Sequence, residues 1–197
     1  SIKFIILGCG SSLGVPRIDG FFGNCDPKNN KNYRTRCCAL IKSKNKNILI
    51  DTSPDLKQQL IKSKINNIDK VFYTHHHADQ THGINELRFF YLKNRKKIDI
   101  YTNNLTKKYL LNSFGYCFKK NREYPPILQN NSLKKKHSYK DNGKIISLKS
   151  IKVEHGNIDS ICYVINNKLA YASDVSKIHK KDLKSLNNLK YLVIDCL

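Results

Sequence analysis

The chain has 197 residues, 40% of them hydrophobic, and carries 36 Lys and Arg against 15 Asp and Glu, a formal net charge of +21. This length suits one domain, spanning residues 1–197, with a hydrophobic core of its own. The apolar runs are far shorter than the roughly 20 residues of a membrane-spanning helix, and the start is too short for a signal peptide, so we expect a cytoplasmic protein.

Strands and helices alternate in the first half of the sequence. Strands are predicted at residues 3–7, 37–41, 47–50, 71–74 and 98–101, and a glycine loop (8–14) follows the first strand. Ser53 suits a helix N-cap and Pro54 a first helical position. Leu56, Leu60 and Ile61 would form the apolar face of that helix, and helices are also predicted at 84–92 and 106–114.

The second half is richer in strands. Residues 119–144 are polar and are predicted to be mostly loop. Strands follow at 145–148, 151–153, 161–165 and 169–172, then a helix at 180–186 and a strand at 191–194. Two clusters of strands, each followed by a helix, predict an α+β fold in which two sheets pack face to face with helices outside. Because the last strand has no cap after it, we expect the native chain to continue.

The cysteines indicate a reducing compartment. The chain has seven of them, an odd number, without a CxxC pair, which is not a disulfide framework. Cys9, Cys38 and Cys162 lie in apolar runs, so we expect them in the core.

Four histidines and one aspartate lie within residues 75–82, directly after a predicted strand. Alternate side chains of an extended segment point the same way, so His75 and His77 can bind one ion together with Asp79 beside them. His76 should point away from them. Imidazole and carboxylate ligands suit Zn, Mn or Fe. The alternative is a polar loop of solvated histidines, which the preceding strand and the following Gly83 disfavour.

The pattern Thr-His-x-His-x-Asp followed by Gly resembles the signature of the metallo-β-lactamase superfamily, whose fold is a four-layer αβ/βα sandwich. Residues 8–17, 33–36, 48–52 and 82–88 resemble the branch that contains the phosphoribosyl cyclic phosphate phosphodiesterase of the carbon–phosphorus lyase pathway. The resemblance covers nearly the whole chain.

The resemblance implies further metal ligands. His155 and Asp174 stand where the family has its third histidine and an aspartate that bridges two metals. The family's Asp-His pair is Asp79-Gln80 here. An amide oxygen is a much weaker ligand than imidazole, so we expect Gln80 to contact the metal ligands and not the metal. His82 could substitute for the missing histidine. We therefore expect one or two divalent ions, Zn or Mn.

The family's last histidine has no counterpart near the end of this sequence. His179 lies in a Lys-rich helical stretch and is expected to be solvated, as is His137. We expect the missing ligand beyond the last residue.

Other residues are candidates to orient the ligands and to bind substrate. Asp79 would orient the nucleophile or hold a second ion, and Asp51 would fix the tautomer of a ligating histidine or simply cap a strand. A substrate phosphate could be bound by Ser11 and Ser12 of the glycine loop. Arg34 and Arg36 are candidates for the same role, with structural pairing as the alternative.

These residues predict a metal-dependent hydrolase, a phosphodiesterase that acts on cyclic nucleotide- or phosphoribosyl-type substrates. The alternatives are a nuclease resembling tRNA 3′-end processing enzymes, and a binding module that has lost a complete dimetal site. The net charge favours the nuclease, whereas 30 Lys and 22 Asn against 6 Arg favour compositional bias over a dedicated phosphate surface. We expect a small phosphodiester or nucleotide as the partner, with nucleic acid as the less favoured one. We expect no association with a membrane, and a homodimer is left open.

Overall fold

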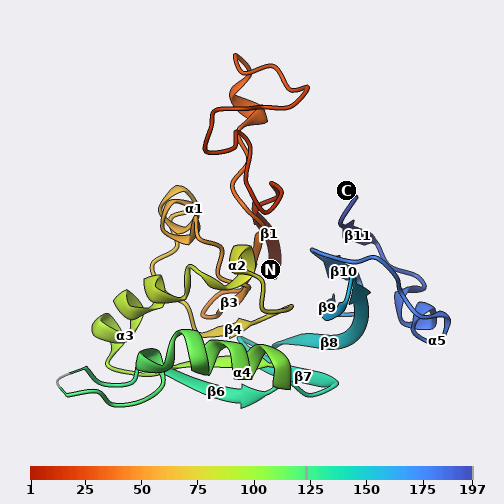
Figure 1. Ribbon diagram of the computed structural model, residues 1–197. Coiled ribbons are helices and arrows are strands. Elements are labelled where there is room, and N and C mark those ends of the chain that lie inside the picture. Colours follow the sequence, from red (N-terminus) through yellow and green to blue (C-terminus); the bar gives the residue numbers. More distant parts are fainter. Residues whose placement is uncertain (123, 197) are drawn as a thin grey trace. The chain divides into compact units, whose positions relative to one another are not determined.

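The computed structural model describes residues 1–122 and 124–196 and has an α+β fold with two sheets (Figure 1). The chain divides into two compact units. The N-terminal unit comprises Lys3–Lys42 and Lys46–Asn131, and the C-terminal unit comprises Ser1–Ile2, Ser43–Asn45 and Ser132–Leu197. Each unit contains most of one sheet, as the two clusters of predicted strands indicate.

The sheet of the N-terminal unit has the strand order β1-β2-β3-β4-β5-β6. Its strands are β1 (Lys3–Gly8), β2 (Cys38–Lys42), β3 (Asn47–Ile50), β4 (Lys70–Phe72), β5 (Ile98–Thr102) and β6 (Leu128–Ser132). The first three strands are antiparallel, whereas β3, β4 and β5 are parallel. The ends of β3 and β4 therefore meet at one edge of the sheet, which is where the histidine segment leaves β4.

Short helices connect these strands: η1 (Asn30–Asn32), α1 (Leu56–Lys62), α2 (Ala78–Thr81), η2 (Ile84–Leu87), α3 (Arg88–Asn94), α4 (Asn104–Ser113) and η3 (Gly115–Cys117). The predicted start of α1 is two residues early, because Ser53 Oγ accepts the N–H of Asp55 in a turn before the helix. The predicted apolar face is also wrong at Ile61, which is 68% exposed, whereas Gln59 is buried in its place.

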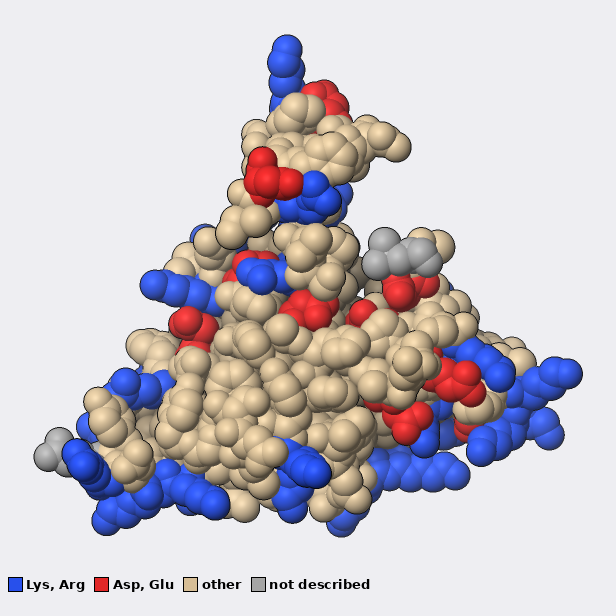
Figure 2. Space-filling view, in the orientation of Figure 1, with Lys and Arg blue, Asp and Glu red and all other residues tan. Residues whose placement is uncertain are grey.

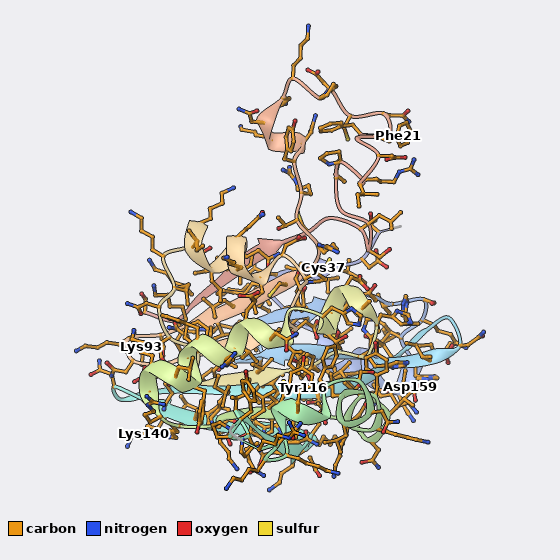
Figure 3. All side chains as sticks on the ribbon, turned by 60° about the vertical axis from the view of Figure 1, so that its left-hand side comes forward. Phe21, Cys37, Lys93, Tyr116, Lys140 and Asp159 are labelled. Carbon is orange, nitrogen blue, oxygen red and sulfur yellow. The ribbon has the colours of Figure 1, made fainter. Side chains whose placement is uncertain are left out.

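The segment between β1 and β2, which we call the arm (residues 11–33), extends away from the sheet of its unit (Figure 1). It exposes large apolar side chains, including Leu13, Ile18 and Phe21. Figure 3 labels Phe21 on this segment. At its base, the backbones of Val15 and Arg34 exchange two hydrogen bonds. The arm is therefore anchored at its base.

The sheet of the C-terminal unit has the order β11-β10-β9-β8-β7. Its strands are β7 (Lys136–Asp141), β8 (Lys144–His155), β9 (Ile158–Ile165), β10 (Leu169–Ala172) and β11 (Tyr191–Ile194), with α5 (Lys180–Leu183) and η4 (Lys184–Leu186) before the last strand. The prediction of a loop over 119–144 is wrong, since β6 and β7 lie there. Polar residues of β7 alternate with buried ones, such as His137, which is 9% exposed and accepts the N–H of Lys134. His137 is therefore not the solvated residue that we expected.

Strand β8 is continuous where the sequence predicts two strands. Lys149 and Ser150 interrupt the apolar pattern, yet Lys149 pairs with β7 and both residues pair with β9. Lys149 Nζ also donates to Ser185 Oγ at 2.5 Å. Hydrogen bonds of the main chain and of one side chain thus replace the apolar contacts that the prediction required.

Lys and Arg side chains are spread over many elements on the face shown in Figure 2 and do not gather in one patch. All seven cysteines fall in the described part of the chain and are free. Cys38 and Cys162 are buried as predicted, whereas Cys9 is exposed and the prediction for it is wrong. Across residues 1–122 and 124–196, every helix is too short or too polar to span a bilayer.

Candidate metal centre

His75 and His77 are the first pair of candidate ligands and lie in the N-terminal unit. Both follow β4, and His77 has the extended backbone of a helix N-cap (φ −63°, ψ 157°) before α2. Their rings lie 4.6 Å apart at 76°, and each offers a nitrogen within 4.8 Å of the other. His75 is fully buried and His77 is exposed. The pair therefore has a buried, fixed member and an accessible one.

Thr74 connects His75 to Asp51, a link that the sequence analysis missed. Asp51 Oδ1 accepts the backbone N–H of Thr74 at 2.7 Å, and its Oδ2 accepts the Thr74 hydroxyl at 2.8 Å. The same hydroxyl lies 3.0 Å from His75 Nδ1. Because a carboxylate only accepts, the single hydroxyl proton points to Asp51, and Thr74 must accept from His75. His75 thus carries its proton on Nδ1, which leaves the lone pair of Nε2 as the ligand atom.

Asp51 reaches Thr74 from an unusual backbone conformation. It is fully buried and has φ = 63°, a left-handed conformation that is uncommon outside glycine. Such conformations cost on the order of 1–3 kcal/mol and persist where the surroundings enforce them. The backbone N–H of Asp51 donates to the carbonyl of Phe72 on the neighbouring strand β4. The conformation therefore places the carboxylate at the point where β4 ends.

Asp79 lies in the first turn of α2, so strand alternation does not position it as the sequence analysis assumed. Its carboxylate is held by Gln80, whose Nε2 donates to Asp79 Oδ2 at 3.0 Å. Gln80 is fully buried, and its carbonyl accepts the N–H of Thr52 at 2.7 Å. Gln80 thus acts on Asp79 through a hydrogen bond, which is the supporting position expected for it.

Gly83 allows the chain after α2 to pack against the loop before α1. Its N–H donates to the carbonyl of Thr52 at 2.9 Å. A Cβ at this position would lie 1.9 Å from the carbonyl oxygen of Ser53, so no larger residue fits without movement of the backbone. The glycine of the signature therefore has a packing role.

The remaining histidines of the segment contact α4. His82 Nε2 lies 2.9 Å from the Tyr109 hydroxyl, and its ring meets Phe114 edge-on at 5.5 Å. The His76 ring lies 5.4 Å from that of Tyr109. Burial lowers the pKa of His76, and the neighbouring His77 lowers it further. His76 is half-buried and His82 exposed, and His82 could join a metal site through Nδ1 or after Tyr109 moves.

His155 and Asp174 are a second pair of candidate ligands and lie in the C-terminal unit. His155 ends β8 and Asp174 follows β10, and His155 Nε2 lies 3.9 Å from Asp174 Oδ1. The backbones of Glu154 and Lys177 form a bridge, and Ser176 Oγ accepts the N–H of Gly156 at 2.8 Å. These bonds, which the sequence analysis did not anticipate, hold the loop of Asp174 beside His155.

His179 is fixed by the same loop. Its Nε2 lies 3.2 Å from Glu154 Oε1, and its side chain is 38% exposed. It is thus paired with Glu154 and is not simply solvated as expected.

The arginines expected to bind substrate differ in their environment. Arg36 makes a two-pronged contact with Asp55, with Nε to Oδ2 at 2.9 Å and Nη2 to Oδ1 at 2.6 Å. The hydrogen bonds from Arg36 hold the pKa of Asp55 below its ordinary value. Arg34 is exposed, and its guanidinium approaches only the carbonyl of Tyr33, at 3.4 Å, among the described residues. The structure therefore favours structural pairing for Arg36 and leaves Arg34 accessible.

The glycine loop borders a pocket of about 830 Å³, whose wall includes both Arg34 and Arg36. Ser11 and Ser12 lie in that loop, where the carbonyl of Ser11 accepts the N–H of Gly14 at 2.9 Å. Neither serine is among the described residues that line the pocket. The two arginines thus line this pocket without the two serines.

Comparison with known proteins identifies the family. Residues 46–197 match the model of the beta-lactamase superfamily domain, and the chain belongs to this family. A diphosphatase of the PhnP family has 25% identity and a TM-score of 0.81, over 98% of this chain and 73% of its own. The zinc-bound PqqB of Methylobacterium extorquens (16% identity, TM-score 0.67) covers 99% of this chain and 72% of its own. The metallo-β-lactamase fold and the likeness to the PhnP branch are thereby confirmed.

Two further proteins resemble this chain, one in structure and one in sequence. The short form of human tRNase Z has 16% identity and a TM-score of 0.66, over 98% of this chain and 76% of its own, and shares the fold. An octanoyltransferase of Porphyromonas gingivalis is 28% identical over the whole of this chain. The chain spans only 39% of that relative.

Proposed function

We propose that the chain is a metal-dependent hydrolase that cleaves phosphodiesters of the cyclic nucleotide or phosphoribosyl type. The likeness to a PhnP-family diphosphatase over 98% of the chain supports hydrolysis at phosphorus. The cyclic diester class rests on the resemblance of residues 8–17, 33–36, 48–52 and 82–88 to the phosphodiesterase branch. The fixed tautomer of His75 supports the proposed binding of a metal. The proton of the ring lies on Nδ1, in the contact with Thr74, so the lone pair lies on Nε2.

The donor set fits one or two divalent ions, Zn or Mn. His75, His77 and His155 are the proposed ligands of a first ion, because three imidazoles suit either metal. Asp79 and Asp174 are the proposed ligands of a second ion, with His82 as a further candidate. The metal supplies Lewis-acid chemistry that activates water at neutral pH and polarises the phosphodiester.

The protein residues orient the reacting groups. Asp51 and Thr74 keep the His75 ring in one tautomer and one orientation. Gln80 occupies Asp79 Oδ2, which leaves Oδ1 either to accept a proton from the attacking water or to hold the second ion. Arg34, with Ser11 and Ser12, is the proposed contact of the substrate phosphate, whereas Arg36 is bound to Asp55.

The proposal is tested by measuring hydrolysis by the protein after treatment with a chelator and after reloading with Zn or Mn. The substrates are a 2′,3′-cyclic nucleotide, a phosphoribosyl cyclic phosphate and a tRNA precursor. We expect turnover of a cyclic diester that the chelator abolishes and metal restores. Asp79→Asn should reduce kcat by at least about a hundredfold, because it removes the proton acceptor. His137→Ala, which lies outside the proposed site, is the control.

The two alternatives give different results in the same assay. Cleavage of the tRNA precursor without cleavage of either small diester would replace the proposal by a nuclease. Metal binding with no turnover of any of the three substrates would replace it by a binding module, for which Gln80 in place of the family's histidine is the motivation.

A further inference from the structure

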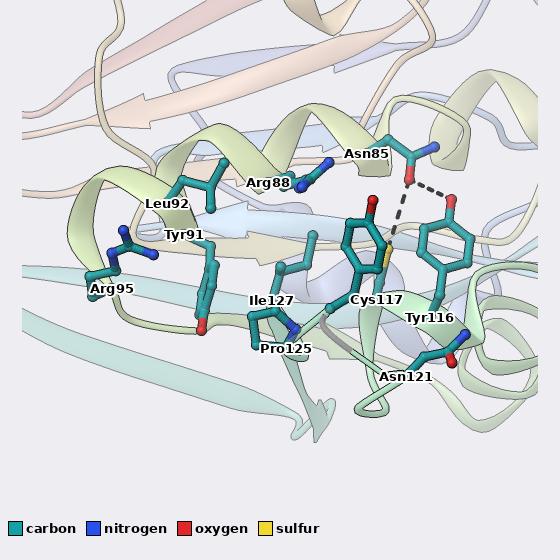
Figure 4. Close-up of a pocket in the computed structure, with 11 residues that line it drawn as sticks. Asn85, Arg88, Tyr91, Leu92, Arg95, Tyr116, Cys117, Asn121, Pro125 and Ile127 are labelled. Carbon is teal, nitrogen blue, oxygen red and sulfur yellow. Dashed lines mark hydrogen bonds between the residues drawn. The ribbon is translucent and has the colours of Figure 1, made fainter.

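A second pocket lies in the N-terminal unit, between α3, η3 and residues 121–122 and 124–127 (Figure 4). Its volume is about 880 Å³, and its buried floor includes Cys117 and Ile127. Pockets for small molecules usually have roughly 300–1,000 Å³ and a mostly apolar wall with a few polar groups. None of the proposed metal ligands lines this pocket, so the candidate metal centre does not account for it.

One wall of the pocket is positively charged. Arg88, Tyr91 and Arg95 lie three and four residues apart on α3 and its C-cap, which places them on one helix face. They project toward the other lining residues in Figure 4. No acidic residue is among the described residues that line the pocket. Two of the six arginines of a Lys-rich chain thus converge on one concave site, which suits a phosphate group.

A second wall, in contact with Arg88, is aromatic. The guanidinium of Arg88 lies over the ring of Tyr124, with Cζ 5.1 Å from the ring centroid. Tyr116 is half exposed, and Tyr91 also lines the pocket. Nucleobases stack on such rings and on guanidinium planes. The wall therefore suits a flat aromatic ligand.

Two amides add hydrogen-bonding groups. Asn85 Oδ1 accepts the Tyr116 hydroxyl at 2.5 Å and the Cys117 thiol at 3.8 Å, which fixes the orientation of the amide (Figure 4). The NH₂ group of Asn85 is then the part of the amide that can donate to a ligand. Asn121 supplies a second amide. Asn side chains can donate to and accept from the edge of a nucleobase.

The pocket has the character of a binding site and not of a catalytic one. Burial raises the pKa of Cys117 to about 11, so its thiol is neutral and a poor nucleophile at physiological pH. His, Asp and Glu are all missing from the described lining residues, which leaves no general base of the usual kinds.

We propose that this pocket binds a mononucleotide, with the base against Tyr124 and the phosphate between Arg88 and Arg95. The site is separate from the metal centre, so the nucleotide is an accessory ligand and not the substrate undergoing hydrolysis. Asn85 and Asn121 contribute hydrogen bonds to the base.

Calorimetric titration of the whole chain with 5′-AMP, adenosine and ribose 5-phosphate tests the proposal. AMP should bind at least about tenfold more tightly than either fragment, because only AMP uses both walls. The Arg88→Gln/Arg95→Gln variant should weaken AMP binding by about tenfold or more. The matched Lys96→Gln/Arg122→Gln variant removes two charges outside the lining and should bind as the unmodified chain does.

Two more variants separate the sites. Tyr124→Ala should weaken AMP but not ribose 5-phosphate, and His75→Ala should leave AMP binding unchanged. Absence of AMP binding would overturn the proposal. So would an affinity that the arginine pair does not influence, or one that depends on His75, since the nucleotide would then occupy the metal centre.

Discussion

The buried Asp51 carboxylate and the His75 ring are connected by a single hydroxyl, that of Thr74. Because the hydroxyl has one proton and gives it to Asp51, the His75 ring must donate from Nδ1. The position of the lone pair on Nε2 is thus set by Asp51 and Thr74, neither of which is a proposed ligand. This relationship explains why a threonine directly precedes the first histidine of the segment.

Thr74→Val should therefore weaken metal binding with little change in shape, because it removes the hydroxyl but keeps the branched side chain. Loss of such a supporting group typically reduces metal affinity by about 10–100-fold. Competition between the protein and a chromophoric chelator for Zn measures the affinity. Thr74→Ser keeps the hydroxyl and should bind nearly normally, so equal affinities of the Val and Ser variants would contradict the inference.

Gln80→His should increase the occupancy of the proposed second metal site. Imidazole is a much stronger ligand than an amide, and this substitution restores the Asp-His pair that the family has. We expect the number of bound Zn ions per chain to rise, as measured by elemental analysis after dialysis. Because Gln80 is buried, the thermal midpoint of the variant serves as the control for folding. An unchanged stoichiometry in a folded variant would argue against a second site next to Asp79.

The pair of Arg36 and Asp55 should make the free energy of unfolding depend on pH in the acid range. Hydrogen bonds from Arg36 lower the pKa of Asp55 in the folded chain. The contribution of the pair to the free energy of unfolding is therefore complete above the unfolded pKa of Asp55, about 3.9, and is lost as the pH falls through the folded pKa. Asp55→Asn should reduce the free energy of unfolding by about 1–2 kcal/mol at neutral pH, a range already reduced for partial exposure.

Urea unfolding of both proteins across pH checks this prediction. The difference between them should be constant above about pH 5 and shrink below about pH 4. A difference that grows as the pH falls would have the wrong sign and would contradict the lowered pKa.

Gly83→Ala should destabilise the chain, because the new Cβ would lie 1.9 Å from the carbonyl oxygen of Ser53. We expect a loss of about 2 kcal/mol or more in the free energy of unfolding. Gly115→Ala is the matched control, since a Cβ there has no described neighbour within 4 Å. Similar unfolding midpoints for the two variants would show that the loop of Ser53 moves easily.

The sequence was sufficient for most strands, because runs such as residues 47–50 and 169–172 are apolar throughout. It was insufficient where main-chain pairing overrides composition, as at Lys149 and Ser150 within β8. The histidine pair could be predicted from alternation, whereas Asp79 could not, since a helix begins after His77.

Contacts between residues far apart in sequence were also beyond prediction. Nothing near Arg36 in the chain indicates Asp55 as its partner, because the contact depends on how α1 returns to the start of β2. Likewise, the order of strands alone does not reveal that Ser176 binds the backbone of Gly156 and steadies the loop of Asp174.

The zinc affinity of single histidine variants tests the central claim most directly. The proposal needs His75, His77 and His155 to bind the same ion. His155→Ala should therefore reduce zinc affinity by at least about a hundredfold, as should His77→Ala, while His137→Ala should not. A His155→Ala variant that is folded and binds zinc as tightly as the unmodified chain would contradict the account.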